Sequence, residues 1–459
     1  MQGDLQWPDG VEGADVRRSD VLGAVSPPRP GVDDGVLRRT PYSVNPRVGA
    51  KGTRTRRRIL RAALGVFGQV GYHACNVERI TAVVGCSRPT FYQYFSSMED
   101  VFRHLAGQLA HDLTEINEAL GPITPDIAGR ARLREWLGRF GDLYDEYAPL
   151  FAVFSVAAHS DEVVASGALQ VQARLVAGLA ASVPKTAWPG DSHEVTALVL
   201  LGMLMRAHRY RKVLGAPEAG DVVDLGRDRL DDALADFMHR TMYGPLRGVN
   251  VCPPVAPVID YLDTRAVSGG AVVERRALGA VGRATRAQLL AAATKVFIER
   301  GYDGTNVADI VSAAGISHGT FYIYFANKDE VLQILAAKAY RQAMAAVEAI
   351  PEPATVSVRQ WLEEYAHTYA DAGPLIRIFI EAVSLDPALR ATVAQAVDMV
   401  RQRLVRFAAA RGEGDADADA LVLLALLDLA LFFAPGQRVP ESAVRDAVAA
   451  AIERGFVAH

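Results

Sequence analysis

The fold of this protein is decided by a stretch of sequence that occurs twice. Residues 55–101 are TRRRILRAALGVFGQVGYHACNVERITAVVGCSRPTFYQYFSSMEDV, and residues 285–331 are TRAQLLAAATKVFIERGYDGTNVADIVSAAGISHGTFYIYFANKDEV. The two stretches align without a gap at a constant shift of 230 positions, which pairs Phe67 with Phe297. Chance does not produce such a run, so the chain contains a duplicated structural unit.

Each copy has the pattern of three helices. Residues 56–70 place apolar side chains on one helical face, and Gly71 ends that helix. Asn76 caps a second short helix, Gly85 allows a tight turn with positive φ, and Ser87 caps a third helix over 88–95. Two short helices joined by a glycine-containing turn predict a helix-turn-helix, whose second helix enters the major groove of DNA.

The exposed residues of these helices are the candidates for DNA contact. The first residues of each third helix are expected to face base edges, the tyrosines to reach phosphates through their hydroxyls, and the basic side chains to lie near phosphates. The predicted DNA-binding residues are Arg56, Ser87, Arg88, Pro89, Thr90, Tyr92, Gln93 and Tyr94 in the first copy, and Arg286, Ser317, His318, Gly319, Thr320, Tyr322, Ile323, Tyr324 and Lys328 in the second.

The charge of the chain is consistent with local DNA contact. The formal net charge is −4, so the chain is not a general polycation. A dense basic cluster nevertheless opens the first copy, comprising Lys51, Arg54, Arg56, Arg57, Arg58 and Arg61. Such a run is by itself equally typical of a solvated face, but beside a helix-turn-helix it favours phosphate binding.

Composition narrows the class of protein. Half of the residues are apolar and 22% are charged, as in soluble globular proteins. The three cysteines form no C-x-x-C pair, so we expect no metal site and no disulfide framework, in agreement with a reducing cytosol. The sequence shows neither a secretory signal nor an apolar run of the roughly 20 residues that a membrane span needs, so we expect a cytoplasmic protein without a membrane partner.

Helical periodicity dominates the rest of the chain, so we predict an all-α fold of two tandem units. A weaker match at a shift of 225 positions extends the repeat downstream, pairing Trp136 with Trp361, for example. The expected segments are a disordered tail over 1–50, a first DNA-binding domain over 51–113, a first helical regulatory domain over 114–243, a linker over 244–281, a second DNA-binding domain over 282–342 and a second helical regulatory domain over 343–459.

Aromatic residues of the regulatory domains are candidates for lining an apolar ligand pocket, with ordinary core packing as the alternative. They are Trp136, Tyr144 and Phe154 in the first unit, and Trp361, Tyr369 and Phe379 in the second.

The repeated segments resemble the signature of the TetR family of transcriptional regulators. The residues that carry the resemblance are Gly71-Tyr72, Asn76-Val77, Ile80, Gly85, Ser87 and 90–95 in the first copy, and Gly301-Tyr302 with 315–330 in the second. The whole chain is similar to the single-chain, double-TetR regulators of actinobacteria. This resemblance implies two three-helix DNA-binding domains, two helical effector domains, pairing through the last helices, and repression that a small ligand relieves. Some tandem relatives are tied to lipid import or metabolism, which by analogy points to a lipid-like ligand. The first copy departs from the family at Met98, where Lys328 of the second copy matches the usual basic residue.

Several alternatives remain open at this point. We expect no enzyme and no cofactor, because the nucleotide-binding, nucleophile-elbow and zinc-protease motifs are absent from the sequence. One helix-turn-helix could bind a protein instead of DNA, or the chain could be an architectural DNA binder. The active form is expected to be either a pseudo-dimer within one chain or a homodimer. Because Arg88 aligns with His318, Pro89 with Gly319 and Gln93 with Ile323, we predict an asymmetric operator for double-stranded DNA.

Overall fold

The fold was taken from a computed structural model of the 459-residue chain. It describes residues 49–71, 75–160, 162–189, 192–217, 225–246, 279–302, 304–348, 357–369, 387–409, 414–431 and 439–457. These residues are almost entirely helical, and none of the described segments is a β-strand. None of the described helices is long and apolar enough to cross a membrane. The predicted all-α fold with two tandem units is confirmed.

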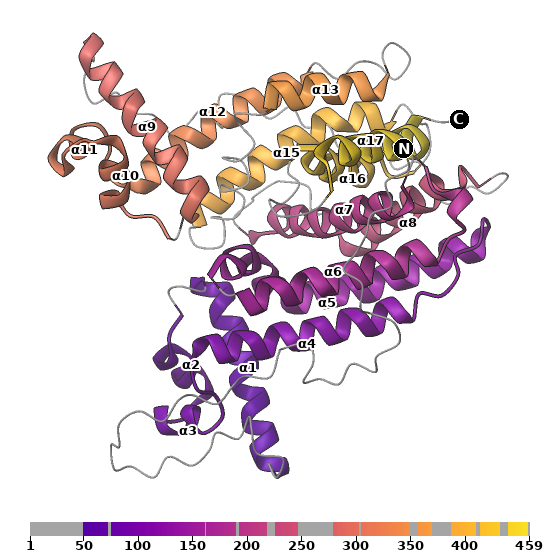
Figure 1. The fold of residues 1–459 in the computed structure, drawn as a ribbon, viewed down its shortest axis with the longest axis horizontal. Helices are drawn as coiled ribbons and strands as arrows, with labels where there is room; N and C mark the ends of the chain where they lie inside the picture. Colours follow the sequence, from indigo (N-terminus) through magenta and orange to yellow (C-terminus); the bar gives the residue numbers. More distant parts are fainter. Residues whose placement is uncertain are drawn as a thin grey trace.

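The first unit begins with a three-helix domain and continues into a set of further helices (Figure 1). The three-helix domain consists of α1 (Ala50–Val70), α2 (Val77–Val84) and α3 (Arg88–Tyr92). The helices that follow are α4 (Met98–Glu118), α5 (Ile127–Ser160), α6 (Glu162–Ala181), α7 (His193–Leu214) and α8 (Arg227–Tyr243), with a 3₁₀ turn, η1 (Lys185–Ala187), between α6 and α7.

The second unit repeats this order. Its three-helix domain consists of α9 (Ala280–Arg300), α10 (Val307–Ala314) and α11 (His318–Tyr324). The helices that follow are α12 (Lys328–Glu348), α13 (Val358–Tyr369), α15 (Pro387–Ala409), α16 (Ala416–Leu431) and α17 (Glu441–Ile452), and a final π-helical turn, η3 (Glu453–Val457), extends α17.

Two expected boundaries fall inside single helices. The boundary at 113/114 lies within α4, and the boundary at 342/343 lies within α12. In α4 the buried side chains Leu105, Leu109, Leu113 and Ile116 recur at helical spacing, so one continuous apolar stripe joins the DNA-binding domain to the helices behind it. The expected linker over 244–281 lies between the end of α8 and the start of α9, and nearly all of it is outside the described residues.

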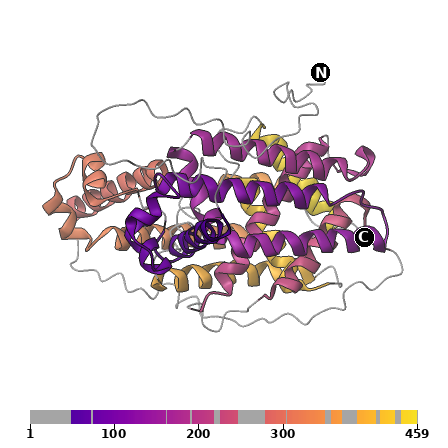
Figure 2. The same cartoon turned by 90° about the horizontal axis from the view of Figure 1, so that it is seen from below.

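The two units pack against each other through their last helices. Helix α7 contacts α16 and α17, and helix α8 contacts α16 and η3. The side chains at the centre of this contact are aliphatic, and Leu200, Leu204, Leu423 and Leu427 are fully buried. The two three-helix domains lie toward the same end of the long axis, with α9–α11 at the upper left and α1–α3 at the lower left of Figure 1, and both toward the left in Figure 2.

Candidate nucleic-acid interface

The two helix-turn-helix units are built from the same local interactions. In the first, the Asn76 side chain accepts a hydrogen bond from the backbone N–H of Arg79 at 3.0 Å and caps α2. Gly85 ends α2 with φ of 69°, a left-handed conformation that glycine adopts without steric cost. The Ser87 hydroxyl then caps α3 by accepting from the backbone N–H of Thr90 at 3.3 Å. Sequence therefore dictates the turn.

The second unit repeats each of these interactions. Asn306 accepts from the backbone N–H of Asp309 at 3.0 Å, and the Asp309 carboxylate accepts in return from the N–H of Asn306. Gly315 has φ of 65°, and Ser317 accepts from the N–H of Thr320 at 3.2 Å. In both units the serine and threonine hydroxyl oxygens are 2.9 Å apart. The geometry of α3 is thus reproduced in α11.

A shared aromatic core holds each third helix in place. Its fully buried members are Phe67, Ile80, Phe91 and Phe95 in the first unit, and Phe297, Ile310, Phe321 and Phe325 in the second. The guanidinium of Arg56 lies 5.5 Å from the centre of the Phe95 ring, and Arg286 lies at the same distance from Phe325. This cation–π contact fixes both arginines beside the third helix.

The base-facing candidates lie at the surface. Arg88, Pro89 and Gln93 are exposed on and beside α3, as are His318, Gly319 and Ile323 on α11. Thr90 and Thr320 are half-buried because their hydroxyls take part in the caps. Ile323 is 66% exposed, which is unusual for a large aliphatic side chain. The caps, the turn and the buried core, which together form the frame of the helix-turn-helix, are common to both units, whereas the exposed side chains differ.

The four tyrosines are not equivalent. Tyr92 and Tyr322 are exposed at 43% and 54%, whereas Tyr94 is only 7% exposed and packs in the core. Tyr324 is half-buried against the same kind of core. The second tyrosine of each pair follows the first by two residues, which on a helix turns it toward the protein interior. Tyr92 and Tyr322 are therefore the accessible candidates for phosphate contact.

Lys328 makes contacts that sequence did not indicate. Its ammonium donates hydrogen bonds to the backbone carbonyls of Tyr302 and Thr305, at 3.0 and 2.9 Å, and lies 4.2 Å from the centre of the Tyr302 ring. The lysine therefore closes the loop before α10 onto the start of α12. Met98 takes this position in the first unit and packs against the core.

Arg58 and Gln288 position the turn in their respective units, and the sequence did not indicate this shared role. The Arg58 guanidinium donates to the carbonyl of Val84 at 2.6 Å, and the Gln288 amide donates to the carbonyl of Ala314 at 2.8 Å. Both bonds join the first helix to the end of the second at equivalent positions. The basic residue Arg58 is thus tied to the fold as well as adding charge. The repeat pairs Arg58 with Gln288, but unlike residue types gave no signal of a shared role.

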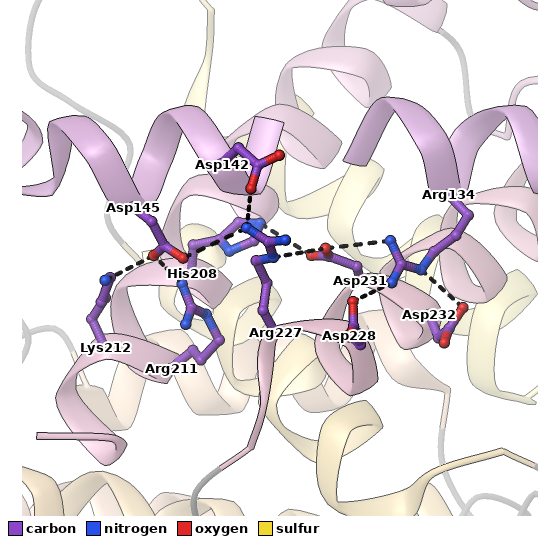
Figure 3. Close-up of polar contacts among 10 residues, drawn as sticks. All are labelled: Arg134, Asp142, Asp145, His208, Arg211, Lys212, Arg227, Asp228, Asp231 and Asp232. Atoms are coloured by element: carbon purple, nitrogen blue, oxygen red, sulfur yellow. Dashed lines mark hydrogen bonds and ion pairs between the residues drawn. The ribbon is translucent and has the colours of Figure 1, made fainter. Parts of the chain in front are cut away.

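The helices behind the first DNA-binding domain contain a network of charged residues that joins three helices, α5, α7 and α8 (Figure 3). Arg134 of α5 pairs with Asp228 at 2.9 Å and with Asp232 at 3.0 Å, both on α8. Asp145 of α5 pairs with Arg211 and, at 2.8 Å, with Lys212, both on α7. These pairs hold α5 against α7 and α8.

His208 and Asp231 lie buried beneath this network. Both side chains are fully buried, and the histidine Nε2 and carboxylate Oδ1 are 3.7 Å apart, too far for a hydrogen bond. Burial lowers the pKa of His208 to about 3, with the charge of Arg211 acting in the same direction. Burial raises the pKa of Asp231 to about 7, opposed by the nearby guanidinium of Arg134. The His208 ring stacks on Tyr144, with ring centres 5.4 Å apart.

The predicted pocket residues that the structure describes lie in the core. Trp136, Tyr144 and Trp361 are 3%, 5% and 4% exposed. Phe154 lies in α5 and Tyr369 ends α13, but their side chains are outside the described residues, as is the whole of Phe379. Trp136 and Trp361 occupy equivalent helices, as the repeat predicts.

A surface cavity of about 420 Å³ opens between α13 and α17, and sequence did not indicate it. None of the three described pocket candidates lines it. Its lining is formed by Arg359, Leu362, Glu363, Ala366, His367, Ser442, Arg445 and Asp446.

Comparison with known proteins agrees with this geometry. A model of the family described as bacterial regulatory proteins, tetR family, matches residues 59–105 and 289–335, which run from within α1 to the start of α4 and from within α9 to the start of α12. Two helix-turn-helix units in one all-α chain define a tandem helix-turn-helix protein. Each of the two units contains a TetR-type DNA-binding domain.

Curated relatives match only part of the chain. The uncharacterized HTH-type transcriptional regulator YdgC of Bacillus subtilis is 33% identical over 88 residues, which are 18% of this chain and 45% of YdgC. The HTH-type transcriptional repressor DhaR of Mycobacterium sp. (strain GP1) is 31% identical over 125 residues, 26% of this chain and 58% of DhaR. The chain therefore spans less than two thirds of either relative.

Among solved structures, the TetR family transcriptional regulator PfmR from Thermus thermophilus is 20% identical with a TM-score of 0.33, over 40% of this chain and 97% of PfmR.

Proposed function

We propose that this chain is a sequence-specific DNA-binding transcriptional regulator that binds an asymmetric operator through α3 and α11. The observation that carries the proposal is the contrast between frame and surface. The caps, turns and aromatic cores of the two units match, while Arg88 is replaced by His318 and Gln93 by Ile323. Arginine pairs with guanine and glutamine with adenine, whereas isoleucine offers an apolar contact such as one to a thymine methyl.

The pairing of the two units within one chain supports the same proposal. One recognition helix from each unit, α3 or α11, lies toward the same end of the long axis (Figures 1 and 2). A protein with two unlike recognition helices binds two unlike half-sites, because operator symmetry mirrors protein symmetry. We infer half-sites about one helical turn apart, or a small multiple of it.

We propose that the chain represses transcription and that a small, lipid-like effector releases it. The support is the family to which the DNA-binding domains belong and the apolar, aromatic character of residues such as Trp136, Tyr144 and Trp361 in the helices behind them. Such an effector has to bind the free chain more tightly than the operator-bound chain. An effector shifts the equilibrium between two states only if its affinities for them differ.

Selection of bound sequences from random DNA with the purified full chain tests the proposal. The expected outcome is a pair of dissimilar half-sites at one fixed spacing. A perfect palindrome made from either half-site should bind one chain more weakly than the natural pair. Equal binding of the palindrome overturns the asymmetry, and recovery of one half-site alone would mean that only one unit contacts DNA.

A further inference from the structure

The surface that joins the two units is built from related helices. Residues 197–204 of α7 are ALVLLGML and residues 420–427 of α16 are ALVLLALL, so these helices align without a gap. Helix α8 aligns with α17 and η3 in the same way, with Leu230 at the position of Val444. The contacts of α7 with α17 are matched by those of α8 with α16. The two units therefore meet about an approximate twofold axis. Each contact across the surface then has a counterpart, which is the pair of residues at the equivalent positions when the two units are exchanged.

The first contact across this surface has an unlike counterpart. Arg206 pairs with Asp428, while Leu429 lies against Gly202, where a Cβ atom would come within 2.8 Å of Leu429 Cδ2. By the alignment, Arg206 occupies the position of Leu429, and Asp428 that of Met205. The counterpart of the ion pair is thus Met205 with Leu429, a pair without charge.

The second contact follows the same rule. The Arg229 guanidinium donates to both carboxylate oxygens of Asp415, at 2.6 and 2.9 Å, and lies 3.7 Å from Asp417. Bidentate pairing of this kind is specific in geometry as well as in charge. Ala443 occupies the position of Arg229 in the second unit, and Ser192 that of Asp415 in the first. The counterpart again carries no charge.

The third contact is steric. The Phe237 ring lies 4.9 Å from the Phe456 ring and against Gly455, where an added Cβ atom would approach the ring to 2.2 Å. The counterparts are Ala451 for Phe237 and Thr241 for Gly455. A large ring therefore faces a glycine at one place, and a small side chain faces a threonine at the related place.

We propose that these three contacts make the surface an interaction site that accepts only the unlike unit. Pairing of two first units would place Met205 opposite Arg206 where Asp428 stands now, and Ser192 opposite Arg229 where Asp415 stands now, and would press Phe237 onto Thr241. Pairing of two second units would leave Asp428 without a cation, because Leu429 takes the position of Arg206. Each of these partly buried charges would lose its opposite charge without gaining another favourable contact at that position, so like pairings between chains are disfavoured.

This selection gives the surface a role beyond joining the units. If the chain reads an asymmetric operator, as proposed above, then α3 is always presented together with α11 and never with a second α3. Specificity for two unlike half-sites then depends on the helical body as well as on the recognition helices. Selection of the unlike unit and recognition of DNA are separate properties, and the test of the first needs no DNA.

Charge reversal with the full chain tests the proposal. Arg206→Asp and Asp428→Arg each place like charges opposite one another in the same chain and in any unlike pairing with an identical chain. When the two variants are mixed after brief partial denaturation, each unit finds a complementary unlike unit only in the other chain. We expect a two-chain species with twice the 49.4 kDa mass of the chain, enriched at least about tenfold over either variant alone, as a coupling of roughly 1.4 kcal/mol requires. The double variant Arg206→Asp, Asp428→Arg should remain a single chain like the wild type.

A matched control uses an ion pair inside one unit. Arg359 of α13 and Asp446 of α17 are 2.8 Å apart within the second unit. Mixing Arg359→Asp with Asp446→Arg should leave both variants as single chains, because exchange of units cannot restore that pair. A mixture of the first two variants that stays at single-chain mass overturns the proposal.

Milder variants keep the test valid if charge reversal unfolds the chain. Arg206→Gln and Asp428→Asn, alone and together, form a double-mutant cycle read by thermal unfolding of the full chain. A stabilising coupling between the two positions supports the proposal, whereas additive effects on stability overturn it. Failure of DNA selection would leave these outcomes unchanged, so the two proposals can fail separately.

Discussion

The guanidinium of Arg88, the first residue of α3, lies 2.7 Å from the carboxylate of Glu78 on α2. Both side chains remain more than half exposed, so the pair contributes little to stability. The pair matters because of where it lies. It holds Arg88, the main base-facing candidate of the first unit, against the carboxylate of Glu78. The second unit has His318 and Ala308 at these positions and lacks this pair.

We predict that Glu78→Gln strengthens DNA binding by the full chain, because it frees Arg88 and removes a negative charge from the side that faces phosphates. Arg88→Ala should weaken binding by about 1–3 kcal/mol on the natural half-site and much less on a site whose paired base is changed. Titrations of labelled operator at one fixed salt concentration measure both effects. Glu118→Gln, exposed at the far end of α4, is the control. An equal loss for Arg88→Ala on both sites would show that it contacts no base.

The apolar surface of α11 gives a second prediction. Ile323→Gln places at this position the residue that the first unit carries as Gln93. We expect sequence selection with this variant to shift the second half-site toward adenine, because glutamine pairs with adenine through two hydrogen bonds. The first half-site should be unchanged and serves as the internal control. A variant that selects the same sequences as the wild type contradicts the assignment of Ile323 to a base.

The left-handed turn residues give a prediction about stability. Gly315→Ala should destabilise the second DNA-binding domain by roughly 1–2 kcal/mol, because a side chain at its φ of 65° is strained. Gly319→Ala is the matched control in the same helix-turn-helix. Its nearest neighbour to an added Cβ, the Ser317 hydroxyl, is 4.0 Å away, so replacement there should be neutral or stabilising. Thermal unfolding of both variants decides between them, and equal melting temperatures would refute the expectation.

Burial of His208 predicts a pH effect of definite sign. Its pKa is lowered to about 3 in the folded chain, mainly by burial, so the unfolded chain binds a proton near pH 6.5 that the folded chain does not bind. Relative to His208→Phe, the wild type should therefore lose about 2 kcal/mol of stability between pH 7 and 5. The aromatic ring suits the site because Phe140 and Tyr144 flank it. Denaturant unfolding at the two pH values measures the difference, and parallel pH profiles would rule it out.

Asp231 predicts the opposite slope in the same range. Its folded pKa is raised to about 7, mainly by burial, so the folded chain takes up a proton before the unfolded chain does. Relative to Asp231→Asn, the wild type should gain about 2 kcal/mol between pH 7 and 5. The two groups then nearly cancel in the wild type. The same unfolding series measures this, and a loss where a gain is expected would contradict the assigned pKa direction.

Much of the fold was predictable because its determinants are local. Asn76, Gly85 and Ser87 specify caps and a turn through their own backbone and side-chain chemistry, and the repeat at a shift of 230 positions shows that the same frame occurs twice. The exposed differences between α3 and α11 are also visible in sequence, since the surface of a short helix follows from its periodicity.

Tertiary structure decided what depends on neighbours distant in sequence. Burial of Tyr94, the bonds of Lys328 to two carbonyls and the shared role of Arg58 and Gln288 each need a partner that only packing supplies. The pairing of Arg206 with Asp428 joins residues 222 positions apart. Sequence alone therefore determined two similar DNA-binding frames with unlike surfaces. Packing decided how the two units are joined, because complementarity of charge and size across a surface exists only once both sides are folded.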